Sequence, residues 1–379
     1  MKKLLAALAV AALIAGAFFA LSLSKKKEAW RPGIPLAQEH MKVCVIHISN
    51  VEKMTSGYAH AHEIGIREAQ KKIGLSDKQI IRKANVSDID FLANEHVMRE
   101  CIAEGAKIII ATSWNHMPVC AKLAGEYPGV VFAHASGMQH NETNFTNYFG
   151  RIYQPRYLSG IAAGLRSATN KIGYVAAMGK DNSEVTGGIN AFALGVESVN
   201  REAKVYVKVL HRWFDPAGEE EAARSLINKG CDVIAQHSDS PRPQLAAQEG
   251  GKWGIGYNSD MQGDAPRAVI ASVVWNWGVY YTRLIRSVIE GSFTTKPYLG
   301  DLADGMVALT PPEASLLPPG ALEAIAAARK RLESGEFDVF EGTMETNEGR
   351  TVGEQGRRLS DVEILRGMDW YCRNVVEVH

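Results

Sequence analysis

The sequence predicts an α/β protein built from two doubly wound lobes with a ligand cleft between them. Short apolar strand patterns alternate with helical patterns along the chain. Strands such as Lys107–Thr112 are continuous apolar runs, which is typical of parallel sheets covered on both faces. The 379 residues are enough to bury a core in each of two lobes.

The N-terminal residues have the pattern of an export signal. A basic start is followed by an apolar run from Leu4 to Leu23 and then by Lys25–Lys27. Residues 1–24 are therefore either a signal peptide cleaved near Ala15–Ala17 or an uncleaved membrane anchor of about 20 residues. Both readings predict export, to the periplasm or to the outer face of the cytoplasmic membrane. Residues 25–40 form a polar linker.

The first lobe begins with a strand at Lys42–Ile48, a turn, and a helix from Tyr58 to Gly74. Further strands are expected at Lys107–Thr112 and Val130–His134, and Trp114 follows the first of these. The chain is expected to cross to the second lobe near Gly150. We assign residues 41–149 and 257–290 to the first lobe, and residues 150–256 and 291–379 to the second.

The second lobe repeats the strand and helix alternation. Strands are expected at Lys171–Ala177 and Val205–Leu210, and Asp215 with Pro216 marks the start of the next helix. An amphipathic helix from Tyr280 to Glu290 is expected to pack back on the first lobe, and the tail to dock on the second.

Polar and aromatic residues follow three consecutive strand patterns between Gly230 and Gly278. The first strand delivers His237, Ser238 and Asp239, the second Asp260, and the third Trp275 and Asn276. Because the carboxyl ends of parallel strands meet at one edge, these groups are expected to line a crevice. Carboxylates and amides beside aromatics suit a flat ring with polar edges. Alternatively, the tryptophans belong to the core and the polar groups cap helices.

Three motifs in this stretch resemble the PnrA-like basic membrane protein family of ABC transporter substrate-binding proteins. They are Gln236–Pro241, Ile255–Met261 and Ser272–Gly278, and the resemblance extends from about Met41 to the C-terminus. It implies a periplasmic-binding-protein type I like fold, a purine nucleobase or nucleoside as ligand, and an ABC permease in the inner membrane as partner. The family's usual lipid-bearing cysteine is absent.

The resemblance also implies roles for single residues. Tyr58 takes the place of the family's ring-stacking aromatic, and Trp114 stands where the family has a phenylalanine. Glu184 aligns with a family glutamate, although the loop before it is two residues longer. Trp275 replaces a lysine of nucleoside-binding members, so an adenine-like base is expected in preference to its nucleoside. Strand alternation is expected to put Trp275 and Trp277 on opposite faces.

The remaining composition excludes several kinds of protein. The 42 basic and 42 acidic residues give no reason to expect a nucleic-acid partner. Five scattered cysteines without a CxxC pair argue against structural zinc, although one disulfide is allowed. His60 and His62 would lie on different faces of a helix. We therefore expect a monomeric binding protein without catalytic residues, metal or cofactor; the alternatives are a tethered sensory module and a nucleoside hydrolase.

Overall fold

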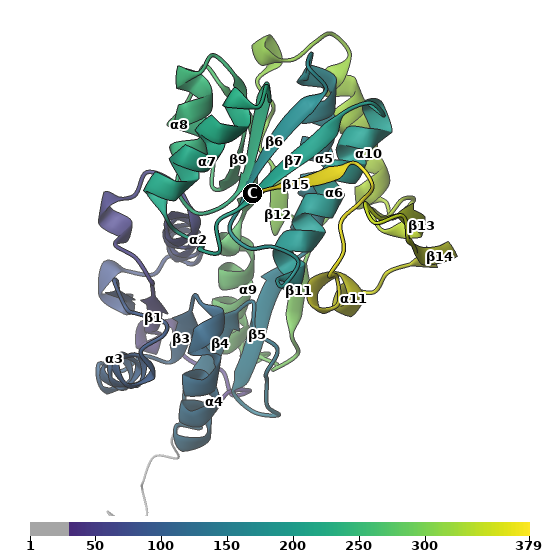
Figure 1. Ribbon diagram of the computed structural model, residues 1–379. Helices are drawn as coiled ribbons and strands as arrows, with labels where there is room; N and C mark the ends of the chain where they lie inside the picture. Colours follow the sequence, from purple (N-terminus) through teal and green to yellow (C-terminus); the bar gives the residue numbers. More distant parts are fainter. Residues whose placement is uncertain (1–29) are drawn as a thin grey trace, which may run out of the picture.

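The computed structural model describes residues 30–379, which form two α/β lobes, each around a mainly parallel sheet (Figure 1). The predicted signal or anchor segment, residues 1–24, lies outside the described residues, as does the start of the linker. In the view of Figure 1 the lobe that contains β6 to β10 lies above the lobe that contains β1 to β5.

The sheet of the first lobe has the order β11-β5-β4-β3-β1-β2, and every neighbouring pair is parallel. Its strands are β1 (Val43–Ile46), β2 (Ile80–Lys83), β3 (Ile108–Ala111), β4 (Val131–Ala135), β5 (Phe145–Gly150) and β11 (Tyr298–Gly300). Its helices are α2 (Tyr58–Ile73), α3 (Phe91–Ala103), α4 (Met117–Glu126) and α9 (Trp277–Glu290). Helices α2 and α9 pack against each other, as expected for the helix that returns to this lobe.

The sheet of the second lobe has the order β12-β10-β9-β8-β6-β7-β15, and only its β10–β12 pair is antiparallel among the described residues. Its strands are β6 (Lys171–Ala176), β7 (Lys204–Val209), β8 (Val233–His237), β9 (Trp253–Asn258), β10 (Val269–Trp275), β12 (Val307–Leu309) and β15 (Val375–Val378). Its helices are α5 (Tyr153–Arg166), α6 (Ser183–Val199), α7 (Pro216–Asn228), α8 (Arg242–Glu249) and α10 (Ala321–Glu333).

The C-terminal region adds elements that the sequence analysis did not predict. A two-stranded hairpin, β13 (Glu341–Glu345) and β14 (Thr351–Arg358), projects beside the second lobe and leads into the short helix α11 (Asp361–Arg366) (Figure 1). The tail then docks on the second lobe, as predicted, because β15 pairs with β7. Short 3-10 helices lie at Gln38–His40, Val51–Lys53, Asp77–Gln79, Trp114–His116 and Ala314–Leu316.

The chain passes between the lobes three times, between β5 and α5, between β10 and α9, and between β11 and β12. The structure therefore divides the range 257–290, which the sequence analysis placed wholly in the first lobe. Strand β10 belongs to the second sheet, and only α9 belongs to the first lobe. In the same way, β11 returns to the first sheet although residues 291–379 were assigned to the second lobe. Sequence periodicity locates such strands but not their partners.

Local signals explain where the helices begin. The Asp215 side chain accepts a hydrogen bond from the backbone of Gly218 and Pro216 occupies the first turn of α7, as predicted. Helix α2 follows Gly57, whose φ of 95° favours glycine, and ends at Gly74 in the left-handed region.

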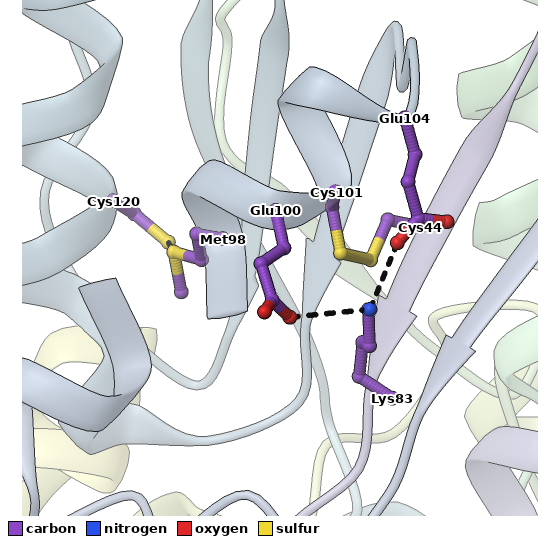
Figure 2. The surroundings of a disulfide bond; sticks show 7 residues. All are labelled: Cys44, Lys83, Met98, Glu100, Cys101, Glu104 and Cys120. Carbon is purple, nitrogen blue, oxygen red and sulfur yellow. Dashed lines mark hydrogen bonds and ion pairs between the residues drawn. A yellow bond between two sulfur atoms is a disulfide. The ribbon is translucent and has the colours of Figure 1, made fainter. Parts of the chain in front are cut away.

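One disulfide joins Cys44 on β1 to Cys101 on α3 and so fixes this helix to the sheet (Figure 2). The sequence analysis had allowed one disulfide without locating it. Cys120, Cys231 and Cys372 are buried free thiols. No group of three or more metal-ligating side chains occurs among residues 30–379.

Candidate ligand site between the lobes

The carboxyl ends of the two sheets face each other, and the lobes touch at the loops that follow these strands. The amide of Gly57 donates to Ser259 Oγ at 2.9 Å, and Thr55 Oγ1 donates to Asp264 Oδ1 at 2.8 Å. A side chain at position 57 would collide with the backbone carbonyl of Asp239. Glycine is therefore required here both for its φ and for the close approach of the second lobe.

Asp239 and Asn258 form a buried polar pair at the ends of β8 and β9. Asn258 Nδ2 donates to Asp239 Oδ1 at 2.8 Å, while Asn258 Oδ1 is buried and no donor reaches it from residues 30–379. Burial raises the pKa of Asp239 to about 8, although the hydrogen bond from Asn258 opposes the shift. At neutral pH the pair therefore presents a protonated carboxyl group beside an unoccupied amide oxygen.

A second group of polar side chains lies beside this pair. Burial raises the pKa of Glu184 to about 7, while Arg366 and Arg156 act in the opposite direction. The Nε2 atom of His237 lies 3.7 Å from Glu184 Oε1, and no donor or acceptor from the described chain reaches either imidazole nitrogen. Burial, together with Arg156, lowers the pKa of His237 well below its usual value, so this imidazole is neutral.

Arg156, on α5 of the second lobe, is a fully buried cation. Its Nη1 donates to the carbonyl of Gln236 at 2.6 Å, and its guanidinium lies 4.0 Å from the ring centre of Tyr257. The remaining guanidinium nitrogens, Nε and Nη2, have no partner among the described residues. Tyr257 also contacts His237, with ring centres 4.5 Å apart. Arg156 therefore holds in place the backbone of Gln236 and the ring of Tyr257, both of which adjoin His237.

The first lobe contributes the two predicted aromatics. Tyr58 begins α2, donates from its hydroxyl to the carbonyl of Thr112 at 2.8 Å, and meets His62 edge-on at 4.5 Å. Its pKa is raised well above 10 by burial and, to a smaller extent, by Tyr148 and by the carboxyl groups of Glu184 and Asp239 in the second lobe. Tyr58 thus lies within electrostatic range of both carboxyl groups of the second lobe.

Trp114 is 37% exposed, and the guanidinium of Arg366 lies 4.7 Å from its ring centre. One face of this indole is therefore covered by the second lobe and not left open for a ligand. The two aromatics are consequently not equivalent.

Three predicted site residues hold local structure. Ser238 is fully buried and donates to Glu219 of α7 at 2.8 Å, away from the pair. Asp260 is exposed and accepts from the backbone of Gln262 at 3.0 Å within a turn. Asn276 donates to the carbonyl of Gly305 at 2.8 Å where two of the interlobe connections meet. The alternative that these polar groups cap helices does not describe their contacts either, because none of the three side chains bonds to a helix N-terminus.

Trp275 lies in the hinge. It is 4% exposed, its ring is stacked on Trp277 at 4.7 Å, and its Nε1 donates to Tyr257 at 3.3 Å. The prediction that Trp275 and Trp277 lie on opposite faces is wrong, because β10 ends at Trp275 and α9 begins at Trp277. Strand alternation does not apply across that boundary.

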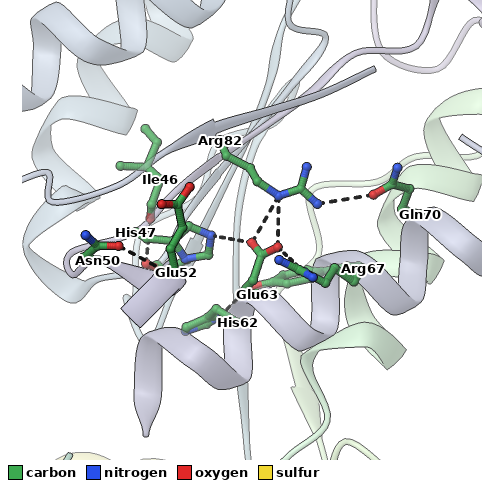
Figure 3. A network of polar contacts seen from close by, with 11 residues as sticks. Ile46, His47, Asn50, Glu52, His62, Glu63, Arg67, Gln70 and Arg82 are labelled. Atoms are coloured by element: carbon green, nitrogen blue, oxygen red, sulfur yellow. Dashed lines mark hydrogen bonds and ion pairs between the residues drawn. The ribbon is translucent and has the colours of Figure 1, made fainter. Parts of the chain in front are cut away.

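The helix that carries Tyr58 is fixed by an ionic network inside the first lobe (Figure 3). Glu63 accepts from Arg67 at 2.5 Å and from Arg82 at 3.0 Å, and it lies 3.2 Å from the Nε2 atom of His47 on the strand-β1 side. Burial alone would raise the pKa of this carboxyl, but these hydrogen bonds lower it to about 2. The position of Tyr58 is therefore set by a well-paired carboxylate.

Four residues at the site were not predicted from the sequence: Arg156, Tyr257, Asn258 and Arg366. Asn258 and Tyr257 stand inside the Ile255–Met261 motif, so their place at a strand end was a usable signal. Arg156 lies in the first turns of α5, a helix otherwise rich in small residues, where a buried cation is unexpected. Nothing in the local pattern around Arg366 indicates a contact with the other lobe.

Comparison with known proteins identifies the family. The profile described as ABC transporter substrate-binding protein PnrA-like matches residues 52–318. A Haloferax volcanii protein named "Putative ABC transporter glucose-binding protein TsgA13" is 33% identical over 313 residues, 82% of this chain and 77% of its own length. A purine-binding protein of Brucella abortus is 29% identical over 343 residues, 90% of this chain and 95% of its own length.

A solved structure shows the same fold. An ABC transporter system solute-binding protein from Conexibacter woesei has a TM-score of 0.65 at 20% sequence identity, covering 79% of this chain and 98% of its own. The fold is therefore of the periplasmic-binding-protein type I kind, and the family and its structural neighbours are solute-binding proteins, not enzymes. The chain belongs to the PnrA-like family of ABC transporter substrate-binding proteins.

Proposed function

We propose that this protein binds an adenine-like purine between its lobes and delivers it to an ABC permease. The observation that carries the proposal is the buried Asp239–Asn258 pair, which lies against Gly57, the residue before Tyr58. A protonated Asp239 donates one hydrogen bond, and Asn258 Oδ1 accepts one. Adenine offers the complementary edge, an exocyclic amine beside a ring nitrogen acceptor.

The protonation state of Asp239 favours a purine edge that places an acceptor beside a donor. Adenine presents N1 beside its amine and guanine presents O6 beside N1–H, so the pair accepts this edge from either base. The guanine edge with two adjacent donors, N1–H and the 2-amine, would need Asp239 as an acceptor, and burial, which raises the pKa of this carboxyl to about 8, opposes that at neutral pH. Leaving a buried donor or acceptor without a partner costs about 1–3 kcal/mol, so binding through that edge would be weak.

Contacts between the lobes favour a base over its nucleoside. The Gly57–Ser259 hydrogen bond and the contact of Arg366 with Trp114 hold the lobes together at two places around the polar pair. A flat ring enters such a site with less separation of the lobes than a base that carries a sugar. We do not expect Trp275 to contact the ligand ring, because its indole is stacked on Trp277 in the hinge.

The family implies the partner and the compartment. Substrate-binding proteins of ABC transporters are exported and pass their ligand to a permease, and we propose the same for this chain, acting as a monomer either free in the periplasm or tethered to the membrane. Across residues 30–379, no helix has both the length and the apolar character needed to cross a membrane.

A calorimetric titration with adenine, adenosine, guanine and glucose at pH 6.5 tests the proposal. Glucose is included because one relative is named for it. We expect adenine to bind most tightly. Tighter binding of glucose would refute the purine assignment, whereas tighter binding of adenosine or guanine would refute only the choice of base.

A further inference from the structure

Helix α11 brings one residue of the C-terminal region into contact with the first lobe. Arg366, its last residue, donates through Nη2 to the carbonyl of Ser136 at 2.8 Å, and its guanidinium lies 4.7 Å from the ring centre of Trp114. Ser136 follows β4 and Trp114 follows β3, so both partners lie at the rim of the first sheet. Arg366 therefore bridges the two lobes beside the cleft.

The rest of α11 is fixed to the second lobe and to the hinge. Ile364 is buried against α6, near Gly187. Asp361 accepts two hydrogen bonds of 2.8 Å from Arg151, which stands between β5 and α5 where the chain first crosses. The Ser360 capping box with Glu363 sets the start of the helix. Arg366 must consequently move with the second lobe.

A side chain that moves with one lobe and bonds to the other makes its contacts only when the lobes are together. We propose that Arg366 is a ligand-retention residue, which locks the second lobe onto the first by covering Trp114 and bonding to Ser136. Opening the cleft breaks both contacts at once. The inference rests on the proposed function only in its ligand measurement, because the contact itself does not depend on what the cleft holds.

The geometry requires arginine at this position. A planar guanidinium stacks on the indole and still directs an N–H at the Ser136 carbonyl, whereas a lysine ammonium can satisfy one of these partners but not in the same flat arrangement. Glu184 lies within electrostatic range of Arg366, so the cation has an acidic neighbour in its own lobe. The side chain is thereby held at the rim while its stacking face points to Trp114.

The first experiment measures adenine release by stopped-flow fluorescence. Arg366→Ala is expected to raise the dissociation rate about tenfold and to change the association rate little, because the latch acts after closure. Arg366→Lys should reverse less than half of this increase in the dissociation rate. The matched control is Arg373→Ala, since Arg373 is also an exposed C-terminal arginine, but it pairs with Glu197 and Glu345 and forms no ion pair with the first lobe within residues 30–379.

The second experiment needs no ligand. Leu92 and Phe214 lie on opposite lobes and are 81% and 54% exposed. Spin labels attached to Leu92→Cys and Phe214→Cys report the separation of the lobes by double electron–electron resonance spectroscopy. The native free cysteines are buried and leave the labels selective. Arg366→Ala should shift the distribution to longer distances, and Trp114→Leu should produce a similar shift. In the double variant the second substitution should add little.

The outcomes separate the two proposals. If Arg366→Ala leaves both the distance distribution and the adenine release rate at the parent values, the latch is refuted and the proposed function stands. If no variant or parent binds adenine but the distances still lengthen, the latch stands and the proposed function fails. Equal effects of Arg373→Ala and Arg366→Ala would also refute the latch, because the loss would then reflect a general charge effect.

Discussion

The two lobes supply different chemistry to the cleft. The first lobe presents aromatic rings and backbone groups, of which Tyr58 and the Ser136 carbonyl are examples, while its buried carboxylate Glu63 is paired within that lobe. The second lobe presents the buried side chains of Asn258 and His237, in which Asn258 Oδ1 and both imidazole nitrogens have no partner among residues 30–379. In our proposal these groups select the ligand by hydrogen bonding and Tyr58 stacks on it, so a ligand completes its contacts only when the lobes close.

We expect substitution of Asp239, in the polar pair with Asn258, to reduce the affinity for adenine most. We expect Asp239→Ala to weaken adenine binding by about 3 kcal/mol, because the ligand loses one hydrogen bond and Asn258 loses its acceptor. Asp239→Asn should retain most of the affinity, since an amide can also offer a donor beside Asn258. Calorimetry of both variants checks this. Equal losses in the two variants would show that the ionised carboxylate, and not the acid, binds the ligand.

We expect Tyr58 and Trp114 to contribute different amounts to the binding free energy of the ligand. Stacking of a base on an aromatic side chain contributes about 1–3 kcal/mol, and we expect Tyr58→Ala to cost an amount in this range. Trp114→Ala should cost less in direct binding, because Arg366 already covers its ring. Affinities of both variants, measured beside the parent, test the order. A larger loss at Trp114 would mean that the ligand displaces Arg366 and stacks on the indole.

Features of the fold that depend on residues close together in the chain could be predicted from the sequence, whereas features that depend on distant residues could not. The α/β class, most strands and the helix starts follow from local periodicity and capping, as Asp215 and Pro216 illustrate. Which lobe β10 joins depends on pairing with β9, which no local pattern records. The site shows the same limit. Asp239 was predicted from its strand end, but the direction of Ser238 is decided by Glu219, a distant residue.

Opposite pH responses should distinguish the lobes. In the second lobe the folded state holds protons on Asp239 and Glu184, with pKa values of about 8 and about 7 against ordinary values of 3.8 and 4.5. The unfolded chain releases these protons first, so the free energy of unfolding should fall as pH rises from about 4 to about 8. In the first lobe the pKa of Glu63 is about 2 against 4.5, so its contribution should be lost as pH falls through that interval.

Single substitutions make this contrast measurable. Asp239→Asn removes a group that is costly to ionise, so we expect it to flatten the decline in melting temperature between pH 5 and pH 8.5 and to have little effect at pH 5. Glu63→Gln should instead lower the melting temperature at neutral pH, by leaving Arg67, Arg82 and His47 without their carboxylate, and should matter least near pH 2. Thermal unfolding of the three proteins across this range is the measurement. If Asp239→Asn and Glu63→Gln shifted the profile in the same pH window, the contrast between the ionised Glu63 of the first lobe and the protonated Asp239 of the second would not hold.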